Sequence, residues 1–175
     1  MEFFLEFSDK ATKIVYDSSY KPVYFIHKTD HVLTLLDLNR NEVGRISKSS
    51  KVLDTYEFNI PQEISGHFLV LSYFASNFIY IPKPRILVGG NTKSFNFSIR
   101  KGTKKVATTS SVLLKNGPHI SIQINGDKNI QLIILLIELF DQFGFLGDKH
   151  RKQSFNKKSK IKIAYNNICG TKKDS

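Results

Sequence analysis

Cysteine is nearly missing from this chain of 175 residues, in which Cys169 has no second cysteine to pair with. A single cysteine excludes a disulfide framework and a thiolate zinc cluster. The five histidines are scattered and form no His-Glu-x-x-His motif, whereas a zinc site needs three or four converging ligands. We therefore expect neither a bound metal nor a cofactor.

Sequence motifs of catalysis are missing as well. The chain has no Gly-x-Ser-x-Gly segment, in which a nucleophilic serine would stand on a strand-to-helix turn. Gly89-Gly90 lacks the third glycine and the following helix of a dinucleotide-binding loop, so we interpret it as a hairpin turn. The carboxylates form no pair at a spacing typical of general acid–base catalysis. These absences predict that the protein is not an enzyme.

Long hydrophobic segments are also lacking. The first seven residues have no basic region and no apolar core of the kind that a secretory signal needs. The most apolar segment, residues 130–140, has 9 apolar residues in 11, but a helix that crosses a bilayer takes about 20. We expect no transmembrane segment, and a cytoplasmic protein that is at most peripheral at the membrane.

Strand-forming sequence, by contrast, is abundant. Apolar residues make up 41% of the chain, and 21 residues are Phe or Tyr, which is enough to fill the core of one domain. Short β-branched and aromatic stretches alternate with turns rich in Asn, Gly, Asp and Ser. About twelve strands are predicted, at Phe3–Phe7, Thr12–Tyr16, Val23–Lys28, Val32–Leu38, Glu42–Ser47, Thr55–Ile60, His67–Phe74, Asn77–Ile81, Arg85–Val88, Ser94–Arg100, Lys104–Leu113 and His119–Ile124.

The periodicity then changes in the most apolar segment. A helix over about residues 128–143 is predicted, with Asp127 or Asn129 as its N-cap and Gly144 closing it. A buried strand is the alternative, but the length and the caps favour a helix. Because this helix is apolar on nearly all sides, it must be enclosed. We predict an all-β fold, a closed antiparallel barrel of about twelve strands around one central, hydrophobic C-terminal helix.

Two hairpins of this predicted barrel resemble one another. Residues 36–46 and 98–108 share the order of strand, polar turn and a valine followed by a small residue. The match aligns Val43-Gly44 with Val106-Ala107. We interpret it as the trace of an internal duplication, although any two β-hairpins share part of such a pattern.

The formal net charge of +11 is spread unevenly. Residues 1–147 hold 17 basic and 13 acidic side chains, whereas residues 148–175 hold 9 basic and 2 acidic ones. We therefore divide the chain into a barrel domain, residues 1–147, and a basic tail, residues 148–175. A purely solubilising tail, or the lysine bias of an AT-rich genome, would give the same excess of positive charge.

The chain resembles the tubby C-terminal-like superfamily and, more closely, its small bacterial LURP-one-related proteins. The likeness rests on the strand–turn–strand pattern of Val32–Ile46, on Val106–Ser111, on His119–Ile124 and on the helix at 129–143. It implies a twelve-stranded barrel around a central helix and no catalysis.

The same resemblance bears on function. Some relatives are associated with phosphoinositide binding and others with phospholipid scrambling, so it implies a lipid partner. It carries over no lipid-binding residue, and Asn41 stands where the family often has glycine.

Basic residues supply the candidate binding sites. Arg100, Lys101, Lys104 and Lys105 lie on both sides of Gly102 in one hairpin and could cup an anion such as a phosphorylated headgroup. A solvated turn is the simpler reading. In the tail, cations alternate with apolar residues, which suits an anionic membrane surface or an added strand. The candidates there are Lys157, Lys158, Lys160 and Lys162.

We therefore expect a non-enzymatic binding module for anionic phospholipid headgroups or for the inner membrane surface. Binding of nucleic acid is the alternative, because lysine attracts a phosphate backbone without sequence specificity. Against it, only 5 residues are Arg and the one predicted helix is enclosed. A protein partner of unknown identity also stays open.

Overall fold

The computed structural model describes residues 1–8, 10–50, 55–73, 76–91, 95–126 and 128–142. These residues form twelve strands and one helix, as the sequence predicts. The elements are β1 (Glu2–Glu6), β2 (Thr12–Asp17), β3 (Pro22–Lys28), β4 (Val32–Leu36), β5 (Glu42–Lys48), β6 (Thr55–Ile60), β7 (Ile64–Tyr73), β8 (Ser76–Ile81), β9 (Ile86–Asn91), β10 (Asn96–Lys101), β11 (Lys104–Leu114), β12 (Gly117–Ile124) and α1 (Ile130–Gln142).

The strands close into a barrel. Each strand pairs antiparallel with its neighbours in the sequence, and β1 pairs with β12 to complete the ring. Along β6, Tyr56, Phe58 and Ile60 are buried while Glu57 and Asn59 are exposed. This alternation is the period of two that a strand with one buried face requires. The predicted closed barrel is confirmed.

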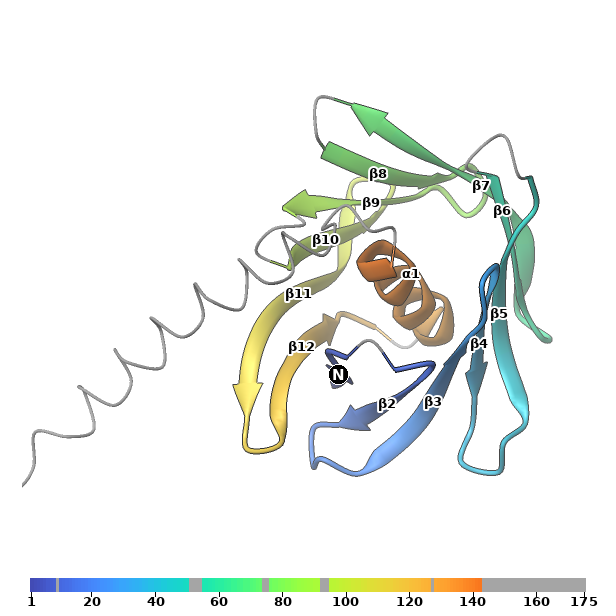
Figure 1. Cartoon of the computed structure of the whole chain (residues 1–175). Helices are drawn as coiled ribbons and strands as arrows, with labels where there is room; N and C mark the ends of the chain where they lie inside the picture. The colour runs from blue at the N-terminus through green and yellow to red at the C-terminus, as the bar shows by residue number, and fades with distance from the viewer. Residues whose placement is uncertain (9, 51–54, 74–75, 92–94, 127, 143–175) are drawn as a thin grey trace, which may run out of the picture.

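Helix α1 fills the interior of this barrel (Figure 1). Every side chain from Leu132 to Ile137 is at most 1% exposed. A helix without a polar face has no stable place in water, and here the strands enclose it on all sides. The prediction that the sheet wraps the apolar segment is therefore confirmed.

The helix lies nearest to β4, β5 and β6. Gly44 on β5 makes this approach possible. A Cβ atom at this position would stand 2.9 Å from Cδ1 of Ile60 and 3.0 Å from Cδ1 of Leu135. The small residue after the valine in the repeated pattern thus has a packing role in this hairpin.

A buried ion pair ties the helix to the barrel wall. The Lys13 ammonium on β2 lies 2.9 Å from Oε1 of Glu138 and donates a hydrogen bond of 2.9 Å to Oε2. The two side chains are 5% and 1% exposed. A charge buried in this way is costly without its partner, so the ion pair fixes the rotation of α1 and its position along the barrel axis.

Three hairpins share one irregularity in their pairing. The register of β2–β3, β4–β5 and β10–β11 each skips one valine of the returning strand, namely Val23, Val43 and Val106. All three valines are partly buried and pack against the core. Gly44 and Ala107, which follow two of them, occupy equivalent positions in the register. The alignment of the two hairpins in the sequence thus reflects a shared β-bulge.

The interpretation of Gly89-Gly90 as a turn is wrong, because both residues lie inside β9. Their lack of side chains serves close packing instead. A Cβ atom on Gly89 would meet the Phe78 ring at 2.8 Å, and one on Gly90 would clash with the backbone of Asn96 and Phe97. Glycine within a strand often marks such a close approach.

The helix begins and ends slightly inside its predicted bounds. The backbone carbonyl of Asn129 accepts the first helical hydrogen bond, from the Ile133 N–H at 2.9 Å. The other predicted cap residues, Asp127 and Gly144, lie outside the described residues, as does the whole tail of residues 148–175. In the part of the chain that is described, no helix has the length and hydrophobicity needed to cross a membrane.

The direction of α1 distinguishes the two ends of the barrel. Strand β12 ends at Ile124 and the chain then enters the helix at Ile130. We call this end the N-end. It also holds the β2–β3, β4–β5 and β10–β11 turns. The opposite end, where the helix finishes and the β3–β4 turn lies, is the C-end.

Candidate functional site

The four basic residues predicted to cup an anion in the β10–β11 hairpin are divided between two faces. Ile99 is buried, so the next residue, Arg100, lies on the outer face of the barrel, where it stands opposite Lys105. Lys101 stands opposite Lys104, and both line a pocket at the N-end. The structure thus brings two of the four cations together at a concave site.

This N-end pocket has a volume of about 240 Å³. Four apolar side chains and three lysines line it, together with Asn125, Gly126 and Asn129 from the connection between β12 and α1. The lining residues are Ile86, Lys101, Lys104, Val106, Ile124, Asn125, Gly126, Lys128, Asn129 and Ile133.

The start of α1 contributes to the electrostatics of the pocket. Asn129 and Ile133 line it, so the first turn of the helix faces the cavity. The first N–H groups of a helix lack partners within the helix and form the positive end of its dipole. No acidic residue stands in this first turn. The pocket therefore combines three ammonium groups with a helix N-terminus, an arrangement that favours an anion.

Two aspartates at the N-end are engaged in their own turns. Oδ1 of Asp17 accepts the N–H groups of Ser19 and Lys21 at 2.8 and 3.0 Å. The Asn41 side chain donates to Oδ2 of Asp37 at 3.0 Å and the Asn41 N–H to Oδ1 at 2.8 Å. These two hydrogen bonds hold the pKa of Asp37 below its usual value. Both carboxylates thus serve hairpin turns.

The strands beside the pocket belong to a half of the barrel that has no acidic residue. Residues 64–126, which form β7–β12, contain 8 Lys or Arg and no Asp or Glu. Because these six strands are neighbours in the sheet, the run makes one continuous side of the barrel. We call it the acid-free half. Among the described residues, no ion pair neutralises Lys101, Lys104 or Lys128.

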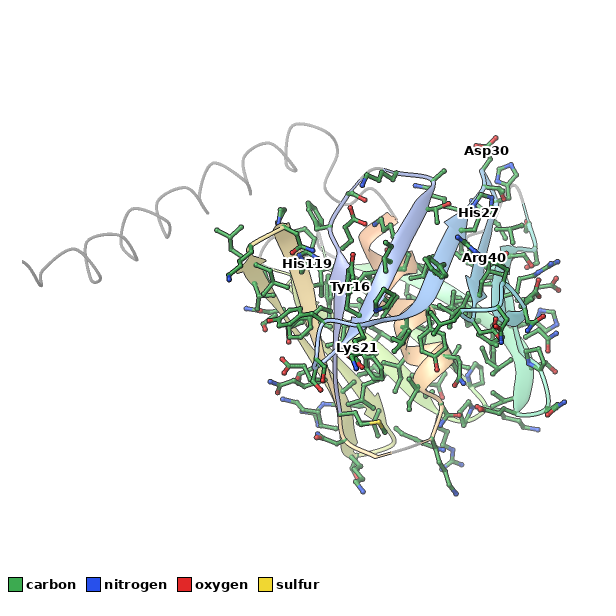
Figure 2. The ribbon with its side chains drawn as sticks, turned by 90° about the horizontal axis from the view of Figure 1, so that it is seen from below. Tyr16, Lys21, His27, Asp30, Arg40 and His119 are labelled. Atoms are coloured by element: carbon green, nitrogen blue, oxygen red, sulfur yellow. The ribbon has the colours of Figure 1, made fainter. Side chains whose placement is uncertain are left out.

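A second pocket, the C-end pocket, has a volume of about 200 Å³ and a different electrostatic character. Lys28, His31 and Lys48 line it, but so does Asp30. It also contacts the last turns of α1, where the helix dipole is negative. Figure 2 shows Asp30 after the end of β3, at the C-end of the barrel, and Lys21 before the start of β3, at the N-end. The C-end pocket therefore favours an anion less than the N-end pocket does.

The histidines stand apart from one another. The Thr12 hydroxyl lies 3.1 Å from Nδ1 of the exposed His27, but no carboxylate of the described residues is bonded to this ring. His119 is buried, with Nδ1 3.0 Å from the carbonyl oxygen of Gly117. Figure 2 shows it on the same side as Tyr16, and the two rings are 5.9 Å apart. Within the described ranges, no three His, Cys, Asp or Glu side chains could hold a metal ion.

The phenol of Tyr24, on β3, is shifted away from ionisation. Partial burial raises the pKa of Tyr24, and the negative charge of Glu63 raises it further. The phenol of Tyr24 therefore keeps its proton at neutral pH.

Two features of the site escaped the sequence reasoning. Lys128 completes the pocket, and its position directly before the predicted N-cap Asn129 indicates a cation close to the start of the helix. The lack of Asp and Glu in residues 64–126 is also visible in the sequence, but it does not emerge when charges are counted only before and after residue 147. The predicted tail candidates, Lys157, Lys158, Lys160 and Lys162, lie outside the described residues.

Comparison with known proteins supports the fold. The chain resembles the X-ray structure of an Arabidopsis thaliana protein, a LURP-one-related protein, with a TM-score of 0.52 and 11% sequence identity. The match covers 80% of this chain and 90% of the plant chain. No family model matches the sequence, and no curated protein does. The tubby-like barrel fold of the LURP-one-related proteins is thus supported through structure alone.

Proposed function

We propose that this protein is a non-enzymatic, tubby-like binding module of bacterial LURP-one-related type, whose N-end pocket takes the phosphate of an anionic phospholipid headgroup. One observation carries the proposal: Lys101, Lys104 and Lys128 converge with the start of α1 on a single pocket. In this proposal the protein works as a peripheral protein on the cytoplasmic face of a membrane, without a cofactor.

The pairing of the hairpin supports a role for these lysines in binding. Lys101 and Lys104 stand directly opposite each other, and so do Arg100 and Lys105. Like charges placed opposite each other across two strands destabilise a sheet. A bound anion between Lys101 and Lys104 would remove this repulsion on the inner face. Local rules of stability are broken most often where a protein binds its ligand.

The chemistry of the pocket suits a phosphate ester better than a free organic acid. Ammonium groups act as point charges that contact phosphate oxygens from several directions. The pocket, whose apolar lining includes Ile86 and Ile133, has a volume of about 240 Å³ and is too small for an acyl chain in addition to a headgroup. The lipid tails would therefore stay in the membrane.

The test uses a water-soluble headgroup. The purified full chain is titrated with inositol trisphosphate by calorimetry, and so is K101Q/K104Q. Losing two charge-assisted contacts should weaken binding at least about tenfold. The matched control is R100Q/K105Q, which removes the same charge from the same hairpin but outside the pocket. We expect the control to bind the soluble headgroup nearly as the parent does.

Equal losses in both double variants would contradict the proposal, because they would indicate attraction by net charge alone. Failure of the parent chain to bind would contradict it as well. Single-stranded DNA that competes for the pocket more tightly than the headgroup would favour nucleic acid as the ligand instead.

A further inference from the structure

The outer face of β7–β9 exposes large apolar side chains. Leu69, Leu71, Tyr80 and Leu87 are 48%, 49%, 44% and 40% exposed. Phe78, between them on β8, is partly exposed. Contiguous apolar surface of this kind on a water-soluble barrel marks an interaction site more often than scattered exposed leucines do. We call these five residues the outer apolar face.

The strand register makes this face continuous. Leu69 pairs with Tyr80, which pairs with Leu87, so the three form one row across the strands. A second row runs from Leu71 to Phe78 and on to the neighbouring glycine of β9, whose missing side chain leaves room for the Phe78 ring. The two rows lie side by side on the same side of the sheet.

The first row continues into positive charge. Leu87 pairs with Arg100, and Arg100 pairs with Lys105. The order across the outer face is therefore three apolar residues followed by two cations. All five residues belong to the acid-free half, where the sequence offers no carboxylate to neutralise the cations.

The row also lies next to the N-end pocket. Ile86 and Lys101 pair with each other one step further along β9 and β10, and both line that pocket. A surface that touches the outer row therefore comes close to the opening where the headgroup is proposed to bind.

We propose that the outer apolar face, together with Arg100 and Lys105, is a surface that docks onto an anionic lipid bilayer. Leu69, Tyr80 and Leu87 enter the interfacial layer, and the two cations contact lipid phosphates. An anionic bilayer presents apolar and negative layers next to each other, which is the complement of this row. The inference rests on the proposed function and assigns the orientation in which the barrel meets the membrane.

The lack of tryptophan in the chain makes a direct test possible. The variants L69W and L87W each carry one fluorophore on the outer apolar face. With phosphatidylcholine vesicles that contain phosphatidylserine, their emission should shift to shorter wavelength, and brominated lipid should quench it. The control is L113W, at a leucine of β11 that is 57% exposed away from this face. It should show neither change.

Loss of binding is measured with L69S/L87S in vesicle sedimentation. Removal of two leucines from the interfacial layer should lower partitioning at least about tenfold. The control is L38S/L113S, which replaces two leucines that are 58% and 57% exposed elsewhere. It should partition as the parent does. Vesicles without phosphatidylserine should bind the parent chain weakly, because the cations then lack their partners.

A parallel titration with inositol trisphosphate separates the two proposals. L69S/L87S should bind this soluble headgroup as the parent does while it loses vesicle binding. Parent-like vesicle binding by L69S/L87S, or a solvent-exposed tryptophan in bound L87W, overturns the docking surface but leaves the pocket intact. A parent chain that is dimeric and becomes monomeric in L69S/L87S, without a change on vesicles, overturns it in favour of an interface between two copies.

Discussion

The two halves of the barrel use charge differently. Residues 1–63, which form β1–β6, contain 10 acidic and 8 basic side chains, whereas the acid-free half contains 8 basic and no acidic ones. In the first half, acids serve the structure: Glu6 pairs with Lys10 at 3.0 Å, Glu42 with Arg45 at 2.7 Å. In the acid-free half, Lys101 and Lys104 line the N-end pocket and Arg100 and Lys105 lie in the outer row, where we propose that they bind a partner from outside the chain.

This difference predicts two kinds of mutational effect. Changes to charges of the first half should lower stability, because their partners lie within the chain. Neutralising charges of the acid-free half should lower binding and leave stability unchanged or slightly higher, because like charges stand opposite each other in its β10–β11 hairpin. The comparison would be contradicted if charge changes in the first half lowered binding alone, or if charge changes in the acid-free half lowered stability.

The largest effect is expected at the buried ion pair between Lys13 of the first half and Glu138 of α1. Glu138→Gln leaves the Lys13 ammonium without its carboxylate inside the barrel, which should lower the free energy of unfolding by about 3–5 kcal/mol. Chemical denaturation measures the change. The double variant K13M/E138L removes both charges and should regain most of the loss. A Glu138→Gln variant as stable as the parent would show that the pair does not hold the helix.

A smaller effect of opposite sign is expected at the start of the helix. Lys128→Glu places a carboxylate near the positive end of the helix dipole, which should raise the free energy of unfolding by about 0.3–1 kcal/mol. The same change should abolish binding of inositol trisphosphate, because it reverses a charge in the N-end pocket. Thermal denaturation and calorimetry on one sample test both. Lower stability together with intact binding would contradict the placement of Lys128 in the N-end pocket beside the start of α1.

The smallest effect concerns pH and the β4–β5 turn. The folded pKa of Asp37 is lowered by its hydrogen bonds to Asn41, so its ionised form stabilises the fold at neutral pH. This contribution is lost as the pH falls below the unfolded value of about 3.9 and through the folded value. The Tm difference between the parent and Asp37→Asn should therefore be small at neutral pH and vanish in acid. A difference that grows in acid would contradict this account.

The sequence contained most of the fold. Strands such as β6 alternate between buried and exposed residues, and the apolar run of α1 could only be stable if enclosed, so element types and closure followed from periodicity and length. The prediction of a turn at Gly89-Gly90 is wrong because glycine is suited both to a tight turn and to a strand position that a neighbouring ring or backbone approaches closely.

Pairing over long distances was harder to predict. Lys13 and Glu138 are 125 residues apart, and no local pattern connects them. The division of Arg100 and Lys101 onto opposite faces follows from strand alternation and was within reach. Their different surroundings, a pocket and an apolar row, depend on which strands become neighbours after closure.

The β1–β12 seam has a consequence for how the chain folds. Leu5 pairs with Ile120, and the amino group of Met1 donates to the carbonyl oxygen of Ile124, 123 positions away. During synthesis, β1 therefore leaves the ribosome long before its partner exists and must keep an open edge in the meantime. Such distant contacts make folding slow, and an unpaired edge can recruit foreign strands. We expect the barrel to close only after synthesis has passed the helix, and the unfinished chain to depend on chaperones until then.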